Sequence, residues 1–487
     1  LKGPPTPLRE VNPKASPALV KIAEGCMARE RRDRYAEMDD VVVDLDRAAK
    51  GQAPFGPHRQ PRRLPRIAAL LAGTLAVAAL AGTAVHHYAR PVQNSPRPEV
   101  AGHLGGAGSL STLPVTRDLQ DPPSSGTRAQ TNVSALTDPS HFTYITNNGA
   151  ITITKYTGPG GAVVIPKEIN GLPVTAIGDS AFIHRGDVTD VSIPDGITKI
   201  GGCAFFNCGG LTQFKIPKSV TSVGGQALDY CGNLTRLVVP KGVKSFTAVI
   251  GCPKLQAFAV DSENPAYWSS PDGVLFNKDR TSLISCPGGR TGDYTIPSTV
   301  RDIPWAAFQI CEKLTHVTIP KGVTNIGNCA FAQCVNLKEM TIPASVVSMG
   351  WGPFADNHAL TAFTVNEDSP AYRNVNGILF DKRGTRLVSY PGGKAGSCRV
   401  PDGVDELDPA AFSGCAFLPS VTLPASVTRV GQSTFARCGS LAAVYFNGNA
   451  PWTGENVFAD SPKAIIYYRP DTTGWGPTFA GRPTAVW

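Results

Sequence analysis

The sequence predicts a mainly β repeat solenoid of 23-residue units with hairpin inserts, preceded by an α-helical fragment and one transmembrane helix. Three observations predict this arrangement. A motif of fixed period recurs from residue 174 onward, a long apolar run lies near residue 70, and an amphipathic pattern occupies the first 55 residues. The abundant glycine (50) and proline (42) agree with many turns between short elements.

Residues 1–55 predict two helices. Ser16-Pro17 is a typical helix start, and Leu19, Ile22 and Met27 follow at helical spacing. A second amphipathic helix begins at about Ala36. The segment resembles the last two helices of a bacterial Ser/Thr protein kinase, on the residues Cys26-Met27, Arg34-Tyr35 and Met38 to Leu45.

That resemblance implies a structural role for Arg34, which would pair with a glutamate upstream of Leu1 in the missing catalytic part. ATP and magnesium would be used by that part alone, and we expect no catalytic residue, cofactor or metal in this chain. The usual Asp-Pro is Glu30-Arg31 here, a departure from the family pattern. An unrelated helical hairpin is the alternative.

Residues 67–85 predict a transmembrane helix. They form a run of 19 residues without a charge, amide or aromatic side chain, close to the roughly 20 needed to cross a bilayer. The basic juxtamembrane segment 56–66 precedes them and favours a cytoplasmic N-terminus. We therefore expect a single-pass protein of the cell membrane with its C-terminal part outside the cytoplasm. A buried alanine-rich core helix is the alternative.

Residues 86–141 predict a disordered linker, since positions 91–140 contain no Phe, Tyr or Trp from which to build a core. The net charge of +8 is concentrated before the apolar run, where residues 1–66 carry +5. The remainder is nearly neutral, so we expect no nucleic-acid partner.

Residues 142–463 predict the solenoid. Within one unit, Leu211, Phe214 and Ile216 follow an L-x-x-L-x-L spacing, Gly224 allows a tight bend, and Leu228 takes the interior position held elsewhere by Phe. Prolines that end strands recur 23 residues apart within each run, at 194, 217 and 240, at 297, 320 and 343, and at 401 and 424.

Both ends of the array carry a predicted cap. Residues 142–156 alternate apolar and polar side chains around Asn147-Asn148-Gly149, which is a hairpin signal. Residues 464–487 are aromatic and depart from the period, so we expect them to form the C-terminal cap.

The repeats resemble the BspA-like subfamily of bacterial leucine-rich repeats, with its I-G-x-x-A-F-x-x-C-x-x-L-x-x-V-x-I-P pattern, over residues 142–487. The units depart from it at Leu228, Arg185 and Asn357, among others. The resemblance implies a binding role toward an extracellular protein or polysaccharide. Together with the kinase-like segment it implies a receptor-like Ser/Thr kinase, and a membrane-anchored surface adhesin or structural protein is the alternative.

Two related inserts, 260–289 and 365–393, interrupt the period, and each predicts a hairpin. Because Tyr, Trp and Arg dominate many interfaces, we predict partner-binding residues in them. The alternative is that these side chains pack the hairpins onto the solenoid. The acidic residues that open each insert, Asp261 and Glu263, then Glu367 and Asp368, could instead ligate calcium. The predicted partner-binding residues are Tyr267, Trp268, Tyr372 and Arg373.

The cysteines keep the repeat register and predict buried free thiols, with a bridge between adjacent coils as the alternative. Arg185-Gly186-Asp187 spells an adhesion tripeptide, but its place in a repeat turn predicts a structural role. No nucleotide-binding, metalloprotease or serine-hydrolase motif occurs in the sequence. The cysteines that follow the Phe position by three residues are Cys208, Cys231, Cys311, Cys334, Cys415 and Cys438.

Overall fold

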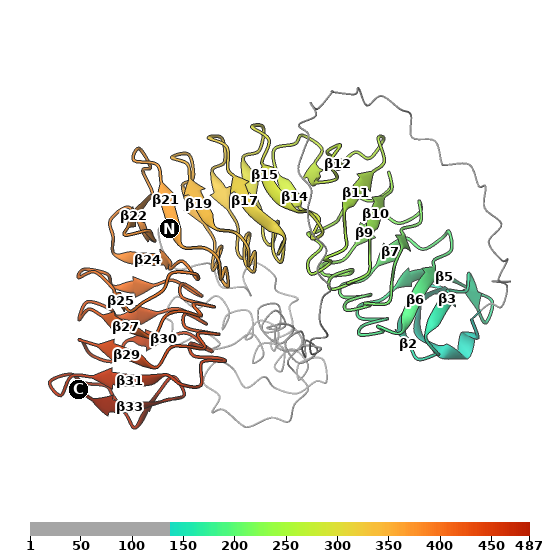
Figure 1. Ribbon diagram of the computed structural model, residues 1–487. Coiled ribbons are helices and arrows are strands. Elements are labelled where there is room, and N and C mark those ends of the chain that lie inside the picture. The colour runs from blue at the N-terminus through green and yellow to red at the C-terminus, as the bar shows by residue number, and fades with distance from the viewer. Residues whose placement is uncertain (1–136) are drawn as a thin grey trace, which may run out of the picture. The chain divides into compact units, whose positions relative to one another are not determined.

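The computed structural model describes residues 137–487, in which short strands form stacked coils along a curved path (Figure 1). The predicted helical fragment with Arg34, the transmembrane helix 67–85 and most of the linker lie outside these residues. Within 137–487, no helix combines the length and apolar character that a membrane crossing requires.

Most coils contribute one strand to each of two ladders in which neighbouring coils pair in parallel. In the first ladder, pairs such as Leu237 with Phe258 and Glu339 with Ala362 lie in register. Its strands are β3 (Gly161–Val164), β6 (Val188–Ser192), β8 (Phe214–Lys215), β10 (Arg236–Val239), β11 (Ala257–Val260), β15 (Gly292–Thr295), β17 (Leu314–Thr318), β19 (Glu339–Ile342), β21 (Ala362–Val365), β25 (Cys398–Arg399), β27 (Ser420–Leu423), β29 (Ala443–Phe446) and β31 (Ile465–Tyr468).

The second ladder is made of shorter strands on the other side of each coil. Ser222 pairs with Lys199, for example, and Asn325 pairs with Asp302. Its strands are β5 (Leu172–Ile177), β7 (Lys199–Ile200), β9 (Ser222–Val223), β16 (Asp302–Ile303), β18 (Asn325–Ile326), β20 (Ser348–Met349), β26 (Glu406–Leu407), β28 (Arg429–Val430) and β30 (Trp452–Thr453).

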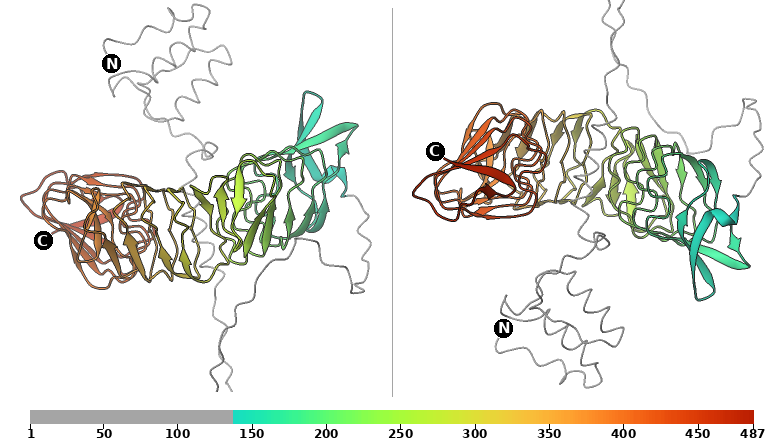
Figure 2. Two further views of the ribbon diagram at one scale, coloured as in Figure 1. Left: turned by 90° about the horizontal axis from the view of Figure 1, so that it is seen from above. Right: turned by 90° about the horizontal axis from the view of Figure 1, so that it is seen from below.

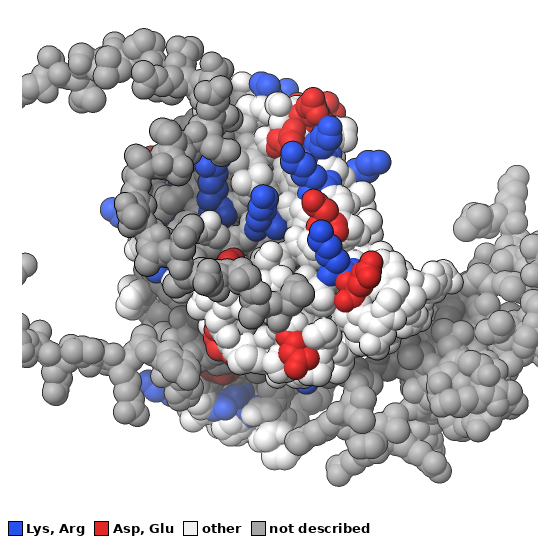
Figure 3. Space-filling model, turned by 90° about the vertical axis from the view of Figure 1, so that its right-hand side faces the viewer, with Lys and Arg blue, Asp and Glu red and all other residues white. Residues whose placement is uncertain are grey.

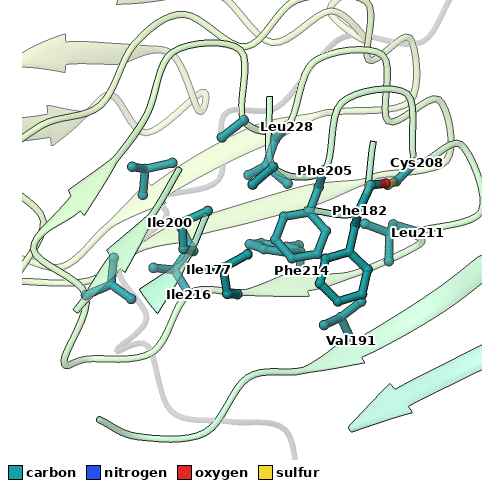
Figure 4. Close-up of a cluster of buried hydrophobic side chains, with 14 of the residues drawn as sticks. Ile177, Phe182, Val191, Ile200, Phe205, Cys208, Leu211, Phe214, Ile216 and Leu228 are labelled. Atoms are coloured by element: carbon teal, nitrogen blue, oxygen red, sulfur yellow. The ribbon is translucent and has the colours of Figure 1, made fainter. Parts of the chain in front are cut away.

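The core is a column of interior side chains between the two ladders, and the Phe position supplies its largest members. Phe182 stacks on Phe205 with ring centroids 4.8 Å apart, and Phe308 stacks on Phe331 at the same distance. Leu228 continues the first stack, as predicted, and is 1% exposed (Figure 4). A coil this small cannot bury its own apolar face, so its stability comes from its neighbours.

Gly224 has a different role from the one predicted. The backbone of Gly224 does not adopt a left-handed conformation with positive φ. A Cβ there would instead collide with the backbone nitrogen of Gly202 in the preceding coil. The glycine is required because the two coils approach closely, not because the bend is tight. The left-handed residues of this coil are Gln226 and Tyr230, which flank Leu228.

The N-terminal cap is the predicted hairpin. Strand β1 (Phe142–Asn147) pairs with β2 (Ala150–Tyr156), and Asn148 and Gly149 adopt the positive φ values of a tight hairpin turn. Figure 2 shows this region projecting from the N-terminal end of the stack. Strand β4 (Glu168–Ile169) and a 3-10 helix at Pro139–His141 complete it.

The C-terminal cap begins later than predicted. Strand β31 belongs to the segment expected as cap, yet it pairs in parallel with β29 and so continues the array. Strand β33 (Arg482–Val486) adds to β31, and β32 (Thr478–Phe479) folds back on β33. Trp475 and Phe479 cover Phe446, with ring centroids 5.0 and 5.5 Å away.

Each insert is an antiparallel sheet of three strands, which confirms the predicted hairpins and adds one strand to each. The first contains β12 (Tyr267–Ser269), β13 (Leu275–Asn277) and β14 (Leu283–Ser285). The second contains β22 (Tyr372–Val375), β23 (Ile378–Asp381) and β24 (Arg386–Ser389), and β24 pairs in parallel with β26 of the next coil. The second insert is thus joined to the short-strand ladder.

Candidate functional site

The inserts hold the predicted partner-binding residues, and the structure places Tyr267 in the core. Its hydroxyl accepts a hydrogen bond from the backbone N–H of Phe246 (2.8 Å) and donates one to the carbonyl of the same residue (3.1 Å). Burial raises the pKa of Tyr267. The tyrosine therefore attaches the insert to the coil before it, as the packing alternative required.

Trp268 is half-buried, and its ring is partly covered by its own insert. The Arg280 guanidinium lies 4.1 Å from the ring centroid, and Phe276 packs against the same side chain at 5.6 Å. A cation over an aromatic face is a stabilising contact within the protein. Little of the Trp268 ring face is left for a partner.

The second insert repeats this plan with different residues. Tyr372 is 4% exposed, and its backbone N–H donates to Ser369 Oγ at 3.2 Å. Arg373 is exposed and takes the place of the tryptophan. Its guanidinium lies directly against Gly384, where the Cβ of any other residue would collide with Nη2.

Two of the four predicted residues, Tyr267 and Tyr372, are therefore structural and cannot form a partner surface, since both are buried. Arg373 is exposed and Trp268 is half-buried, and a binding role for these two residues stays a prediction. Asn264 is a further anchor that the sequence reading missed. It is fully buried, and its amide donates to the carbonyls of Pro240 and Val243.

The acidic residues that open the inserts form turns rather than a metal site. Asp261 Oδ1 accepts a hydrogen bond from the backbone N–H of Glu263 at 2.9 Å, and Glu263 pairs with Lys241 at 3.1 Å. Among residues 137–487, no cluster of three His, Cys, Asp or Glu side chains could hold a metal ion. The described residues thus show no carboxylate cluster of the kind that the calcium alternative invoked.

The arginine and the aspartate of the adhesion tripeptide are bound to each other. Arg185 and Asp187 form two hydrogen bonds of 2.8 Å with each other. The same guanidinium also donates to the carbonyls of Tyr156 and Gly158, so that Arg185 holds the first coil to the cap. The arginine is not free to extend away from the aspartate, which supports the structural reading.

All eleven cysteines within residues 137–487 are free, and the six that keep the repeat register are fully buried, as predicted. Cys208 Sγ donates to the carbonyl of Phe182 in the preceding coil, and Cys231 repeats the contact with Phe205. Burial raises the pKa of the Cys208 thiol to about 12, so these thiols remain protonated. Each of these short side chains acts as a hydrogen-bond donor inside the core.

The residues that replace cysteine keep this donor. Asn357 Nδ2 donates to the carbonyl of Phe331 at 3.0 Å, and Ser461 Oγ donates to that of Phe435 at 2.6 Å. Arg185 makes the corresponding contact with Tyr156. The position therefore selects for a donor that reaches the carbonyl one coil back, which explains why the sequence tolerates such different side chains there.

Two buried carboxylates lie at irregular points of the array. Asp229 is fully buried, and one oxygen accepts from the backbone N–H of Ile250 at 3.1 Å while the other has no partner. Asp356 is 4% exposed, lies against Gly414 and forms a bidentate ion pair with Arg437. The pair joins coils on either side of the second insert.

The structure shows one aromatic surface, of half-buried tyrosines and the exposed Trp487, that the sequence pattern did not predict. On the outer face of the first ladder, Tyr445 stacks on Tyr467 with centroids 5.0 Å apart, and Trp487 packs edge to face on Tyr445 at 4.9 Å. Tyr445 and Tyr467 occupy the register of Thr422. The shared repeat register of these two tyrosines is a signal that the sequence contains. It was not used, because residues from 464 onward were assigned to a separate cap.

Charge is mixed over the N-terminal end of the array. The face shown in Figure 3 carries both Lys/Arg and Asp/Glu side chains, with the two signs interspersed among uncharged residues. An open groove beside the second insert is mixed as well, with Lys382, Arg383 and Arg386 facing Asp381 and Glu406. Neither this face nor the groove carries charged side chains of only one sign.

A family described as "BspA type Leucine rich repeat region" matches residues 175–263, 290–380 and 392–471, in six copies. The matched residues make up more than half of the chain. No curated protein matches the sequence.

Several solved structures of bacterial proteins are similar. A leucine-rich cell surface protein from Faecalibacterium prausnitzii is 26% identical, with 71% of this chain and 89% of that chain covered and a TM-score of 0.37. A leucine-rich-repeat protein from Eubacterium ventriosum is 24% identical, with 65% and 91% covered and a TM-score of 0.37. The pneumococcal vaccine antigen PcpA is 15% identical, with 72% and 98% covered and a TM-score of 0.37.

Proposed function

The chain belongs to the BspA-type leucine-rich-repeat family, and from this premise we propose that its repeat array is the ligand-binding ectodomain of a membrane receptor-like Ser/Thr kinase. The ligand would be an extracellular protein or polysaccharide. The catalytic part would precede Leu1, and the array would act outside the cytoplasm.

The binding role is supported by one observation: interior side chains of the repeats are used for stacking, whereas outward-facing side chains are not. Interior positions such as Phe331 and Leu337 are fully buried and committed to stacking. The outward positions of the first ladder do not close a coil, and among them Val238 is 45% exposed while Tyr445 and Tyr467 are half-buried. Trp487, which follows β33, is 49% exposed beside the two tyrosines. Exposed aromatic surface on a rigid scaffold is typical of binding sites.

The receptor context is supported by the sequence alone. The kinase-like segment with Arg34 and the apolar run 67–85 suggest a cytoplasmic domain, a membrane crossing and an outer domain in that order. The DNA upstream of Leu1 tests this. An open frame encoding a glycine-rich loop, a strand lysine, His-Arg-Asp and Asp-Phe-Gly is expected, whereas a nearby start codon would leave the membrane-anchored surface adhesin.

Activity gives a second test. Residues 1–487 contain none of the phosphate-binding loop, catalytic base or magnesium ligands of a kinase. The purified chain should therefore show no transfer of phosphate from radiolabelled ATP to itself or to a generic protein substrate. Robust transfer would contradict the proposed placement of the catalytic part.

A further inference from the structure

The terminal sheet of the array has an aromatic outer face. It is formed by strands β25, β27, β29, β31 and β33, which pair in that order with β32 at the far edge. Thr422, Tyr445 and Tyr467 lie side by side on successive strands, and Trp487, which follows β33, packs edge to face on Tyr445.

The charge on this sheet has one sign. Its strands contain the arginines Arg399 and Arg482 and no Asp or Glu. Arg482 is occupied, because its guanidinium donates to the carbonyls of Ala464 and Pro462. Arg399 is exposed, and the guanidinium of the exposed Arg469 lies 5.7 Å from the centre of the Trp487 ring.

Neither of these two arginines forms a salt bridge within residues 137–487, where the ion pairs involve other residues. They flank the aromatic row, with Arg399 in β25 before it and Arg469 directly after β31. The face therefore offers ring surfaces and phenol hydroxyls between two unpaired cations.

We propose that this face, defined by Arg399, Tyr445, Tyr467, Arg469 and Trp487, binds an acidic polysaccharide. Tyr445 and Tyr467 cover one face of each other's ring, so sugar contacts fall to the ring edges and to the tyrosine hydroxyls, which bond sugar hydroxyls. Guanidinium groups pair with carboxylates in charge-assisted hydrogen bonds. The register Arg399, Thr422, Tyr445 and Tyr467 runs across four successive strands, and a row of this length suits an extended chain better than a compact molecule, which would need a concave site. The inference rests on the proposed binding function and names its ligand class.

The test uses the full chain in detergent, with polygalacturonate as the carboxylated probe and dextran as the neutral one, measured by affinity electrophoresis. The chain should bind polygalacturonate and not dextran. The double change Arg399→Ala and Arg469→Ala, and separately Tyr467→Ala, should each weaken binding by about tenfold or more. The melting temperature of each variant reports whether the fold is kept.

The short-strand ladder supplies a matched control. There Arg429 lies 5.5 Å from the ring of Trp452, which is 59% exposed. Changing these two residues to alanine removes a similar exposed pair from another surface and should leave binding unchanged. Equal losses in test and control variants would overturn the proposal.

Two further outcomes separate this inference from the proposed function. Capture of dextran or of a defined extracellular protein, undiminished by the Arg399 and Arg469 changes, would refute the acidic-polysaccharide site and leave the binding function intact. Failure to bind any of these ligands by a folded chain would count against both.

Discussion

Replacing Asp229 with asparagine should change how the stability of the array depends on pH. The carboxyl group is fully buried with one oxygen unpartnered, and desolvation raises its pKa from 3.8 to about 8. Between pH 3.8 and about pH 8, the Asp229 carboxyl group is deprotonated in the unfolded chain and protonated in the folded chain. The unfolded state then binds fewer protons, so the free energy of unfolding falls as pH rises through this window.

The size of the effect follows from the width of the window. The loss is at most ~1.4 kcal/mol per pH unit, and on the order of a few kcal/mol in total once relaxation of the site is allowed for. The asparagine side chain would not titrate, but its amide would leave a donor without a partner, at a cost of ~1–3 kcal/mol. The variant should therefore be less stable than the wild type near pH 5 and gain on it steadily toward pH 8.

Urea unfolding at pH 5, 6, 7 and 8 measures this difference, and amide exchange around Ile250 reports it locally. Asp195→Asn, at an exposed position, is the matched control and should change stability little at every pH. A difference between Asp229→Asn and the wild type that stays constant over this range would refute the reasoning.

Three more changes test other parts of the structure. Arg437→Ala should cost ~3–5 kcal/mol in thermal or urea unfolding, because it leaves the buried Asp356 carboxylate unpaired; a loss below ~1 kcal/mol would show that the pair is dispensable. Cys231→Ser should leave the free energy of unfolding within ~1 kcal/mol of the wild-type value, since the serine hydroxyl can donate to the same carbonyl. Cys231→Val should lower it by ~1–3 kcal/mol, because valine has no donor. If chemical denaturation shows the serine variant to be the less stable of the two, the donor role is contradicted. Trp268→Ala should lower the melting temperature more than Arg373→Ala, because only the tryptophan packs against the core; equal melting temperatures combined with a loss of ligand capture would assign both residues to binding.

The period was enough to predict the core. Ile216, Phe331 and Leu337 are all buried at the positions that the repeat assigned to them, because a residue that recurs in register must face the same way in every coil. The substitution of Leu228 for phenylalanine did not disturb this prediction. The antiparallel cap at residues 142–156 followed from its turn residues in the same way.

Contacts at the irregular points could not be read from the period. The Tyr267 hydroxyl bonds to Phe246 and the Asp229 carboxyl bonds to Ile250, and each contact spans 21 residues along the chain instead of the repeat period of 23. Such contacts depend on the path of the chain in space. Sequence alternation revealed the hairpins but not which of their aromatic side chains would turn inward.

The most direct test of the whole account is the side of the membrane on which the array lies. Alkaline phosphatase, which is active only after export, can be fused after Trp487 or, in a second fusion, after Gln60 ahead of the apolar run. The account predicts phosphatase activity from the first fusion and none from the second. An inactive fusion after Trp487 in a chain that is made and stable would contradict an outward-facing binding domain.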